Sequence, residues 1–325
     1  PVPDRLFIAR IVYTEPNDLQ RTGQIRPYAQ AAPARGCRGS LSAGMGTVIA
    51  IASRKGGVGK TTTAVNLAAA LAVAERSTRL VDCDPQANAS SWLGFRWSRS
   101  AGGLPDALAG KGSLQAAIRD TGIPYLYALP GRADLRHAES AAAPPADGTR
   151  TMTTLMGEAR EGWDCIILDT PPTLGLLTTQ AIAAADFLVI PVQSEYLCLD
   201  GLEGFLQAVR TVKEQINPPL CVAGVLLSMV DEDDPLSLRI ARDLRRHLGN
   251  LVFRTVIPRC PEVRACPVRG KPLPFVDVSN GARRYLTLAG EILDRISRRT
   301  VPVPSGERFG AASASTRTTG KESFR

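Results

Sequence analysis

The stretch Lys55-Gly56-Gly57-Val58-Gly59-Lys60-Thr61-Thr62 decides how this chain of 325 residues is interpreted, because a strand-like segment precedes it and a helix-like segment follows. Its glycines let the backbone curl so that N–H groups converge on phosphate oxygens. The following helix adds the positive end of its dipole. We expect Lys60 to reach the β- and γ-phosphates of a nucleotide and the Thr61 hydroxyl to bind Mg²⁺. An ordinary glycine-rich turn is the alternative, which the Lys-Thr pair at the helix start disfavours.

The segments around this loop alternate between strand and helix patterns. The apolar, strand-like runs are Val48–Ala52, Arg79–Asp82, Asp164–Asp169, Phe187–Pro191, Cys221–Met229 and Arg254–Ile257. The helical patterns between them are Thr61–Glu75, Leu202–Gln215, Leu236–Leu248 and Gly281–Ile296. Such alternation, with strands that are apolar throughout, predicts an α/β fold with a mostly parallel, doubly wound sheet covered on both faces. Residues 96–150 show no clear pattern.

Two acidic segments are expected to face the phosphate loop. Asp82 and Asp84 stand at the end of one strand, which is where ligands gather in an open α/β sheet. Asp169 ends the apolar run Cys165–Leu168, from which it could hold Mg²⁺ through water. Either pattern alone is weak, since an Asp-x-Asp at a strand end is commonly a turn or a cap. Together with the phosphate loop, the two segments predict a site for a nucleotide and Mg²⁺.

These motifs resemble those of the ParA/MinD superfamily, the P-loop ATPases with a deviant Walker A motif. The likeness spans residues 46–298, which we expect to form one ATPase domain. Five further segments are similar to the ParA/Soj branch in particular: Leu174–Thr178, Ile190–Tyr196, Gly224–Leu227, Val256–Arg259 and Gly270–Pro272. The resemblance implies an enzyme that hydrolyses ATP to ADP and phosphate with Mg²⁺.

The resemblance also implies roles for individual residues. Lys55 is the signature lysine that crosses a dimer interface to the partner's nucleotide, so dimerisation is coupled to ATP. Asp84 orders the attacking water, which gives a catalytic set of Lys55, Lys60 and Asp84. The expected nucleotide contacts are Gly56, Gly57, Val58, Gly59, Lys60, Thr61 and Thr62, with Met229 and Pro258 at the adenine. The expected metal-site residues are Thr61, Asp82 and Asp169.

The chain departs from the family pattern at three places. Arg54 stands where Gln or Asn is usual. The acidic run Asp231–Asp234 replaces a segment that often carries a DNA-contacting Arg. The segment Arg264–Pro267 lacks a Glu that relatives have. These differences concern DNA contact and switching more than the ATP site.

The net charge of +8 and the pI near 9.3 favour an acidic partner, nucleic acid before membrane. Nine Lys or Arg residues against two acids lie between Arg239 and Lys271. A solvated basic face is the plain alternative, and the family resemblance favours non-specific binding of duplex DNA. The expected DNA-binding residues are Arg239, Arg242, Arg246, Arg259, Arg283 and Arg284.

Other classes of protein fit the sequence less well. No apolar run approaches the ~20 residues that cross a bilayer, and Thr300–Arg325 has too few large apolar residues for an amphipathic membrane anchor of the MinD kind. The seven cysteines form no Cys-x-x-Cys pair, which disfavours zinc. Cys83 and Cys165 lie inside the nucleotide motifs, which disfavours an iron-sulfur reductase.

The sequence and the family resemblance also suggest what the two ends of the chain are and what the protein does in the cell. Residues 1–45 are expected to be a disordered extension or a start-site artefact, and residues 299–325 a flexible tail. The function expected is a cytoplasmic, nucleoid-associated ATPase that dimerises on ATP and segregates a chromosome or plasmid with a ParB-like activator. A ParA-like ATPase that positions a non-DNA cargo, such as a polysaccharide-synthesis or chemotaxis complex, is the alternative.

Overall fold

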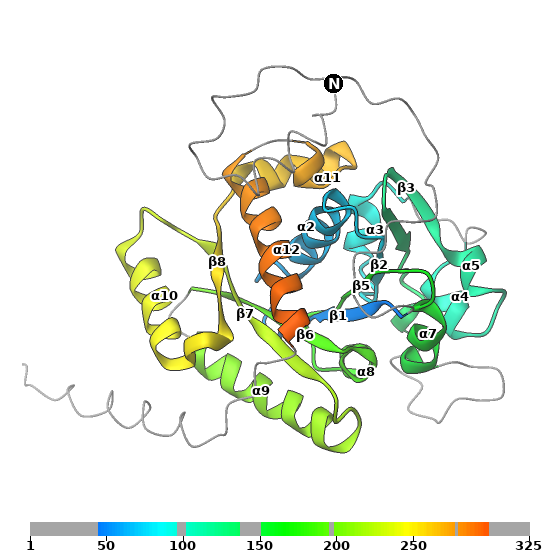
Figure 1. The fold of residues 1–325 in the computed structure, drawn as a ribbon, viewed down its shortest axis with the longest axis horizontal. Helices are drawn as coiled ribbons and strands as arrows, with labels where there is room; N and C mark the ends of the chain where they lie inside the picture. The colour runs from blue at the N-terminus through cyan, green and yellow to red at the C-terminus, as the bar shows by residue number, and fades with distance from the viewer. Residues whose placement is uncertain (1–44, 96–101, 137–150, 195–197, 277–278, 299–325) are drawn as a thin grey trace, which may run out of the picture.

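The computed structural model describes residues 45–95, 102–136, 151–194, 198–276 and 279–298 (Figure 1). The predicted extension over 1–45 and the predicted tail over 299–325 lie outside these residues, apart from Met45. Eight described strands form one sheet in the order β3-β4-β2-β5-β1-β6-β7-β8. They are β1 (Thr47–Ile51), β2 (Thr78–Asp82), β3 (Arg119–Ile123), β4 (Leu126–Leu129), β5 (Cys165–Asp169), β6 (Phe187–Gln193), β7 (Cys221–Val230) and β8 (Val252–Pro258).

The sheet is parallel except where β3 and β4 pair in antiparallel register. The described helices are α2 (Lys60–Val73), α3 (Asn88–Trp92), α4 (Leu104–Leu108), α5 (Leu114–Ala117), α7 (Met152–Ala159), α8 (Leu176–Ala184), α9 (Cys198–Gln215), α10 (Pro235–Leu248), α11 (Cys266–Arg269) and α12 (Asn280–Arg298). Three 3₁₀ turns join them, at Gly249–Leu251, Pro261–Ala265 and Leu273–Phe275. The predicted α/β class is confirmed.

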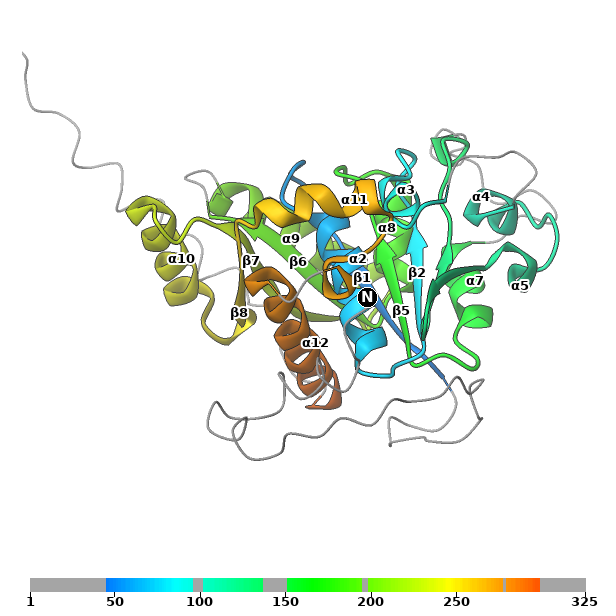
Figure 2. The ribbon, with the colours of Figure 1, turned by 90° about the horizontal axis from the view of Figure 1, so that it is seen from above.

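Helices cover both faces of the sheet. Helices α2, α3 and α12 share one apolar core with it, whereas α7, α8, α9 and α10 share the other (Figure 2). Helix α2 is buried at eleven of its fourteen positions, because it lies between the sheet and α12 and therefore has no broad solvent face. Its run of alanines allows this close approach. The phosphate loop is thus joined directly to a helix that is packed in the core of the molecule.

The six strands predicted from the sequence are all observed, and β3 and β4 were missed. Both lie in residues 96–150, where no pattern was found. Tyr125 joins them in a left-handed conformation with φ 64°, and the Thr121 hydroxyl donates to the carbonyl of Leu126. A strand of four or five residues whose pairing depends on such a turn carries little periodicity of its own.

Strand β2 carries a buried arginine near its start. Arg79 is fully buried, and its guanidinium lies 4.2 Å from the ring centre of Trp163. The ring of Tyr127 meets that of Trp163 edge-on at 5.0 Å. Burial lowers the pKa of Arg79 to about 10, so the side chain is still charged at neutral pH. The aromatic face replaces part of the water that this charge has lost.

Candidate nucleotide site

The phosphate loop turns between β1 and α2 by means of two left-handed glycines. Gly57 has φ 75° and Gly59, the residue before the first turn of α2, has φ 82°. These angles strain any residue with a Cβ, which explains the glycines at these positions. The amide of Thr63 donates to the carbonyl of Gly59 at 2.8 Å, so the helix begins directly at the loop. The earlier N–H groups of α2 are therefore available to an anion.

Lys60 lies within the loop rather than in solvent. Its Nζ donates to the carbonyl oxygen of Lys55 at 2.8 Å, and the side chain is buried. Burial lowers the pKa of Lys60, and the nearby carboxylates of Asp169 and Asp84 oppose that effect. A buried cation at the start of a helix is suited to binding phosphate oxygens.

Asp169 is the last residue of β5, and its buried carboxylate lacks hydrogen-bond partners among the described residues. The residue is fully buried, and both oxygens accept no well-aligned hydrogen bond from the described residues. Burial raises its pKa well above the usual range, and the charges of Asp82 and Asp84 act in the same direction. The hydroxyl of Thr61 lies near enough to lower that pKa, as does the charge of Lys60. An orphaned carboxylate beside a hydroxyl is the oxygen donor set that Mg²⁺ prefers, so these residues fit the metal.

Asp82, by contrast, has its carboxylate engaged by the protein. One oxygen accepts from the amide and the hydroxyl of Ser90 at 2.8 and 2.6 Å, and the other accepts from the amide of Asp84 at 3.2 Å. Burial raises the pKa of Asp82 to about 6, although the hydrogen bonds from Ser90 lower it. The Ser90 hydroxyl in turn accepts from the amide of Gly131. Asp82 therefore anchors α3 and, through Ser90, the loop that follows β4. Its predicted part in the metal site stays a prediction.

Asp84 lies at the same edge of the sheet, two residues after β2. It is almost wholly buried, and one carboxylate oxygen accepts from the amide of Gln86 at 2.9 Å. Its charge acts on both Lys60 and Asp169, so the structure brings these three side chains together. The role of Asp84 in ordering water stays a prediction.

Ser228 of β7, which was not among the residues predicted for the site, holds the phosphate loop. Its hydroxyl donates to the carbonyl of Val58 at 2.8 Å. The next residue, Met229, is left-handed with φ 52°, and its methyl carbon lies 3.2 Å from where a Cβ on Gly59 would be. A buried hydroxyl inside the apolar run of β7 was the signal available in the sequence.

The two residues predicted at the adenine lie at the ends of neighbouring strands. Met229 is in the last part of β7, and Pro258 ends β8 in register with Val230. The structure therefore places Met229 against the phosphate loop and Pro258 one strand further away. Their contact with adenine stays a prediction.

Lys55 and Arg54 line a cavity of about 280 Å³ beside the loop. The other lining residues come from the loop, from β6 and from α9: Ser53, Val58, Val192, Gln193, Gly201, Leu202 and Phe205. The wall of this cavity is mostly apolar. Lys55 thus lies at an accessible position next to the phosphate loop.

The six arginines predicted to bind DNA are divided between two ends of the molecule. Arg239, Arg242 and Arg246 lie along α10, which leads into the start of β8, whereas Arg259 follows the end of β8. Arg283 and Arg284 lie in the first turns of α12.

Three of the six arginines lie near acids. Arg239 is 3.9 Å from Asp243, Arg259 is 3.9 Å from Asp231, and Arg284 is 3.7 Å from Glu232. The acidic run noted in the sequence therefore lies against the cations beyond the end of β8. Within the described residues, no helix is long and apolar enough to cross a membrane.

The chain is similar to proteins of one family over most of its length. A family model described as "AAA domain" matches residues 46–222. "Chromosome partitioning protein ParA" of Myxococcus xanthus is 39% identical over 262 residues, which cover 80% of this chain and 92% of the relative. "Chromosome-partitioning ATPase Soj" of Treponema pallidum is 38% identical over 258 residues, which cover 78% of this chain and 100% of the relative.

A solved structure of similar fold carries a nucleotide. It is the cobyrinic acid a,c-diamide synthase of Mycobacterium smegmatis with a bound ATP analogue and magnesium. The TM-score is 0.66 at 30% sequence identity, with 80% of this chain and 100% of that chain covered.

Proposed function

The chain belongs to the ParA/Soj family of P-loop ATPases, and on that premise we propose that it partitions DNA in an ATP-dependent manner. It is an ATP hydrolase that uses ATP and Mg²⁺. In the proposed cycle it dimerises on ATP, binds duplex DNA without sequence preference, and segregates a chromosome or plasmid with a ParB-like activator. Its place in the cell is then the cytoplasm, on the nucleoid.

The observation that carries the proposal is the match to the M. xanthus ParA over 92% of that protein's length. A match of this extent is far longer than the nucleotide motifs alone and covers most of the chain. The geometry adds independent support, since Lys60 is desolvated beside the orphaned carboxylate of Asp169. Both groups gain partners when a magnesium-bound triphosphate is present.

In the proposed mechanism, each residue at the phosphate loop has one task. The loop N–H groups and Lys60 bind the phosphates, while Thr61 and Asp169 hold Mg²⁺, which neutralises charge on the transferring phosphoryl group. Asp84 orients the attacking water. Lys55 reaches from its exposed position to the nucleotide of a second copy.

Dimerisation would make DNA binding depend on ATP. Closing two copies face to face duplicates the basic residues of α10 on one particle. The second set then acts at a high effective concentration once the first is bound, so affinity rises without a new contact. Hydrolysis separates the copies and releases DNA.

A positioning ATPase for a non-DNA cargo is the second candidate. The specific observation in its favour is that Asp231 and Glu232 lie against Arg259 and Arg284. These contacts lower the positive potential at the end of the molecule that holds the nucleotide site. The two candidates share the ATP site and differ in the partner.

Nucleotide-dependent DNA binding tests the proposal. Purified protein is titrated with non-specific duplex DNA under ATP, ADP or no nucleotide, across a salt series. Tight binding with ATP alone, weakening steeply with salt, is the expected result. No binding under any nucleotide would sink the partition function and leave the cargo-positioning role.

A further inference from the structure

Strand β8 forms an edge of the sheet. Its regular pairing with β7 is interrupted in the middle of the strand. Val252 pairs with Val225, and the next pairing joins Val256 to Leu227. Three residues of β8, Phe253–Thr255, therefore stand opposite one residue of β7. Their main-chain groups need partners other than the neighbouring strand.

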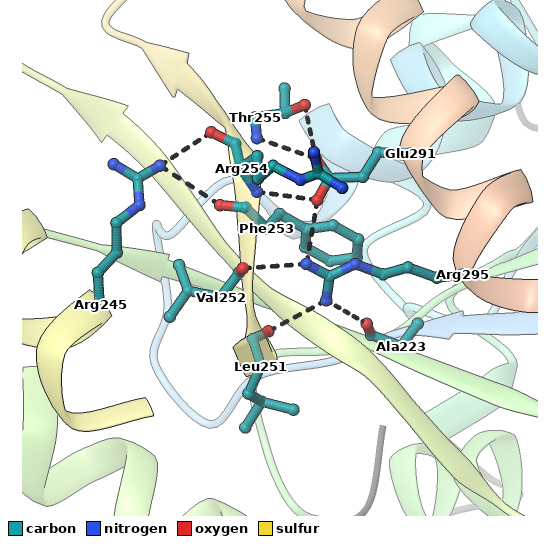
Figure 3. Close-up of polar contacts among 9 residues, drawn as sticks. All are labelled: Ala223, Arg245, Leu251, Val252, Phe253, Arg254, Thr255, Glu291 and Arg295. Carbon is teal, nitrogen blue, oxygen red and sulfur yellow. Dashed lines mark hydrogen bonds and ion pairs between the residues drawn. The ribbon is translucent and has the colours of Figure 1, made fainter. Parts of the chain in front are cut away.

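Glu291 of α12 supplies acceptors for this bulge (Figure 3). One carboxylate oxygen accepts from the amide of Arg254 at 2.8 Å. The other accepts from the amide and the hydroxyl of Thr255 at 2.9 and 2.8 Å. A single side chain thus satisfies two consecutive amides.

Arg295, one helical turn later, holds Glu291 and the start of β8 together. Its guanidinium donates to Glu291 at 3.0 Å and to the carbonyls of Val252 at 3.0 Å and Ala223 at 2.8 Å. It also lies 4.2 Å from the ring centre of Phe253. Gly224 leaves room for this arrangement, because a Cβ there would lie 2.6 Å from the guanidinium.

Arg245 of α10 reaches the same segment from the other face of the sheet. It donates to the carbonyl of Arg254 at 2.9 Å and to that of Phe253 at 3.4 Å. Arg254 therefore has its N–H held by α12 and its C=O held by α10 (Figure 3). Glu291, Arg295 and Arg245 are called the β8 clamp below.

The clamp fixes the backbone of Arg254, whose side chain is exposed. Among the described residues, no ion pair involves the guanidinium of Arg254, Arg242 or Arg246. All three side chains are exposed. Arg242 and Arg246 lie three residues before and one residue after Arg245, on the part of α10 that contacts β8.

Nearby acids are already engaged. Asp294 bonds Arg298 at 2.8 Å, and Glu291 is used by the clamp itself. The cations at this edge therefore differ from Arg259 and Arg284, which lie within 4 Å of acids at the opposite end of β8.

We propose that Arg254, together with Arg242 and Arg246, contacts the sugar–phosphate backbone of duplex DNA, and that Glu291 is a positioning residue that holds Arg254 for this contact. The inference rests on the proposed function and assigns its DNA surface to the β8 edge. Arginines with no acid to displace bind phosphates without losing an existing ion pair. A backbone fixed from two helices lowers the entropy that is lost on binding.

Because Glu291 is negatively charged, two explanations of its role predict opposite changes in DNA affinity when it is replaced. Removing a carboxylate from a DNA-binding surface strengthens binding through general electrostatics, because the protein becomes more positive. A positioning role predicts the reverse, since Arg254 loses its fixed place. Glu291→Gln should therefore weaken DNA binding although it adds one unit of positive charge.

The experiment measures affinity for non-specific duplex DNA by the full chain with ATP and Mg²⁺ over a salt series. Arg254→Ala should weaken binding about tenfold and lower the salt slope by about one for each contacting copy. Arg254→Lys should restore the slope. Glu291→Gln should reproduce part of the Arg254→Ala loss in slope, which a change in folding stability alone leaves unaltered.

Two variants serve as matched controls. Arg269→Ala removes an exposed arginine on α11, and Glu214→Gln removes an exposed carboxylate on α9. Both should leave the slope unchanged. Thermal melting and ATP turnover without DNA show that each variant is folded.

Each other outcome overturns the inference. If the unaltered protein binds DNA with ATP and Arg254→Ala binds equally well, this surface is wrong while the proposed function stands. If Glu291→Gln binds more tightly than the unaltered protein, the positioning role is wrong. If the unaltered protein does not bind DNA, or binds only anionic lipid vesicles, the inference and the proposed function fall together.

Discussion

Asp169 and Glu291 are both carboxylates withdrawn from water beside a cation, and they are partnered in opposite ways. Asp169 lies at the phosphate loop with neither oxygen well bonded, and burial raises its pKa. Glu291 lies under β8, where burial also acts to raise its pKa. Hydrogen bonds from Thr255 and Arg254 outweigh burial and leave that pKa below its ordinary value.

This difference distinguishes a ligand-binding site, whose buried polar groups lack partners, from a structural site, whose polar groups are all hydrogen-bonded within the protein. A buried polar group without partners costs stability, and a protein tolerates it where a ligand later supplies the partners. A fully bonded buried ion pair has no capacity left for a ligand. The polar groups at the phosphate loop are thus explained by binding, and those of the β8 clamp by architecture.

The largest expected effect is on nucleotide binding by Lys60→Ala. We expect ATP affinity to fall by at least about 100-fold, since a charge-assisted contact to phosphate contributes about 3 kcal/mol. Calorimetric titration with ATP and Mg²⁺ measures it. An affinity within about threefold of the unaltered protein would contradict the role given to this lysine.

Asp84→Ala should separate hydrolysis from binding. We expect turnover to fall about 100-fold, because the attacking water loses its orienting carboxylate, while ATP still binds. On DNA, this variant should stay bound in its ATP state. Normal ATP hydrolysis by Asp84→Ala would show that another group orders the water.

Glu291→Gln and Asp169→Asn should change folding stability in opposite directions. Glu291→Gln leaves an amide of β8 unpaired and Arg295 without its anion, so the free energy of unfolding should fall by about 2–4 kcal/mol. Asp169→Asn removes an orphaned charge, so the nucleotide-free protein should gain about 1 kcal/mol. Chemical denaturation without nucleotide measures both. Losses of similar size in the two variants would show that the two carboxylates do not differ in this way.

The smallest effect is the pH dependence of the Glu291→Gln loss. The folded pKa of Glu291 lies below its usual 4.5, so the carboxylate contributes stability above that pH. The contribution is lost as the pH falls through the folded pKa. The stability difference between the two proteins should therefore be full at neutral pH and smaller at about pH 3.5. Denaturation curves at the two pH values test this, with Glu214→Gln as the control for an exposed carboxylate.

The phosphate loop and six of the strands could be predicted because the pattern of each is contained in one short run of consecutive residues. The partner of Asp82 could not, since Ser90 lies eight residues away in α3, a helix of five residues that is too short to show a periodic pattern. The clamp joins Glu291 to Arg254 across 37 residues, and such pairing leaves no local trace. The number of arginines in the sequence likewise did not reveal which of them form ion pairs with acidic residues. Arg254 begins a predicted strand, and nothing in its neighbouring residues distinguishes it from an ordinary strand residue.

The β8 clamp also bears on self-association. An open edge strand presents unpaired N–H and C=O groups, which can recruit a strand from another molecule. Along Phe253–Thr255, a carboxylate and a guanidinium already occupy those groups. A strand from a second molecule would have to displace both side chains before it could pair. The segment that holds Arg254 in place thereby also protects this edge against aggregation.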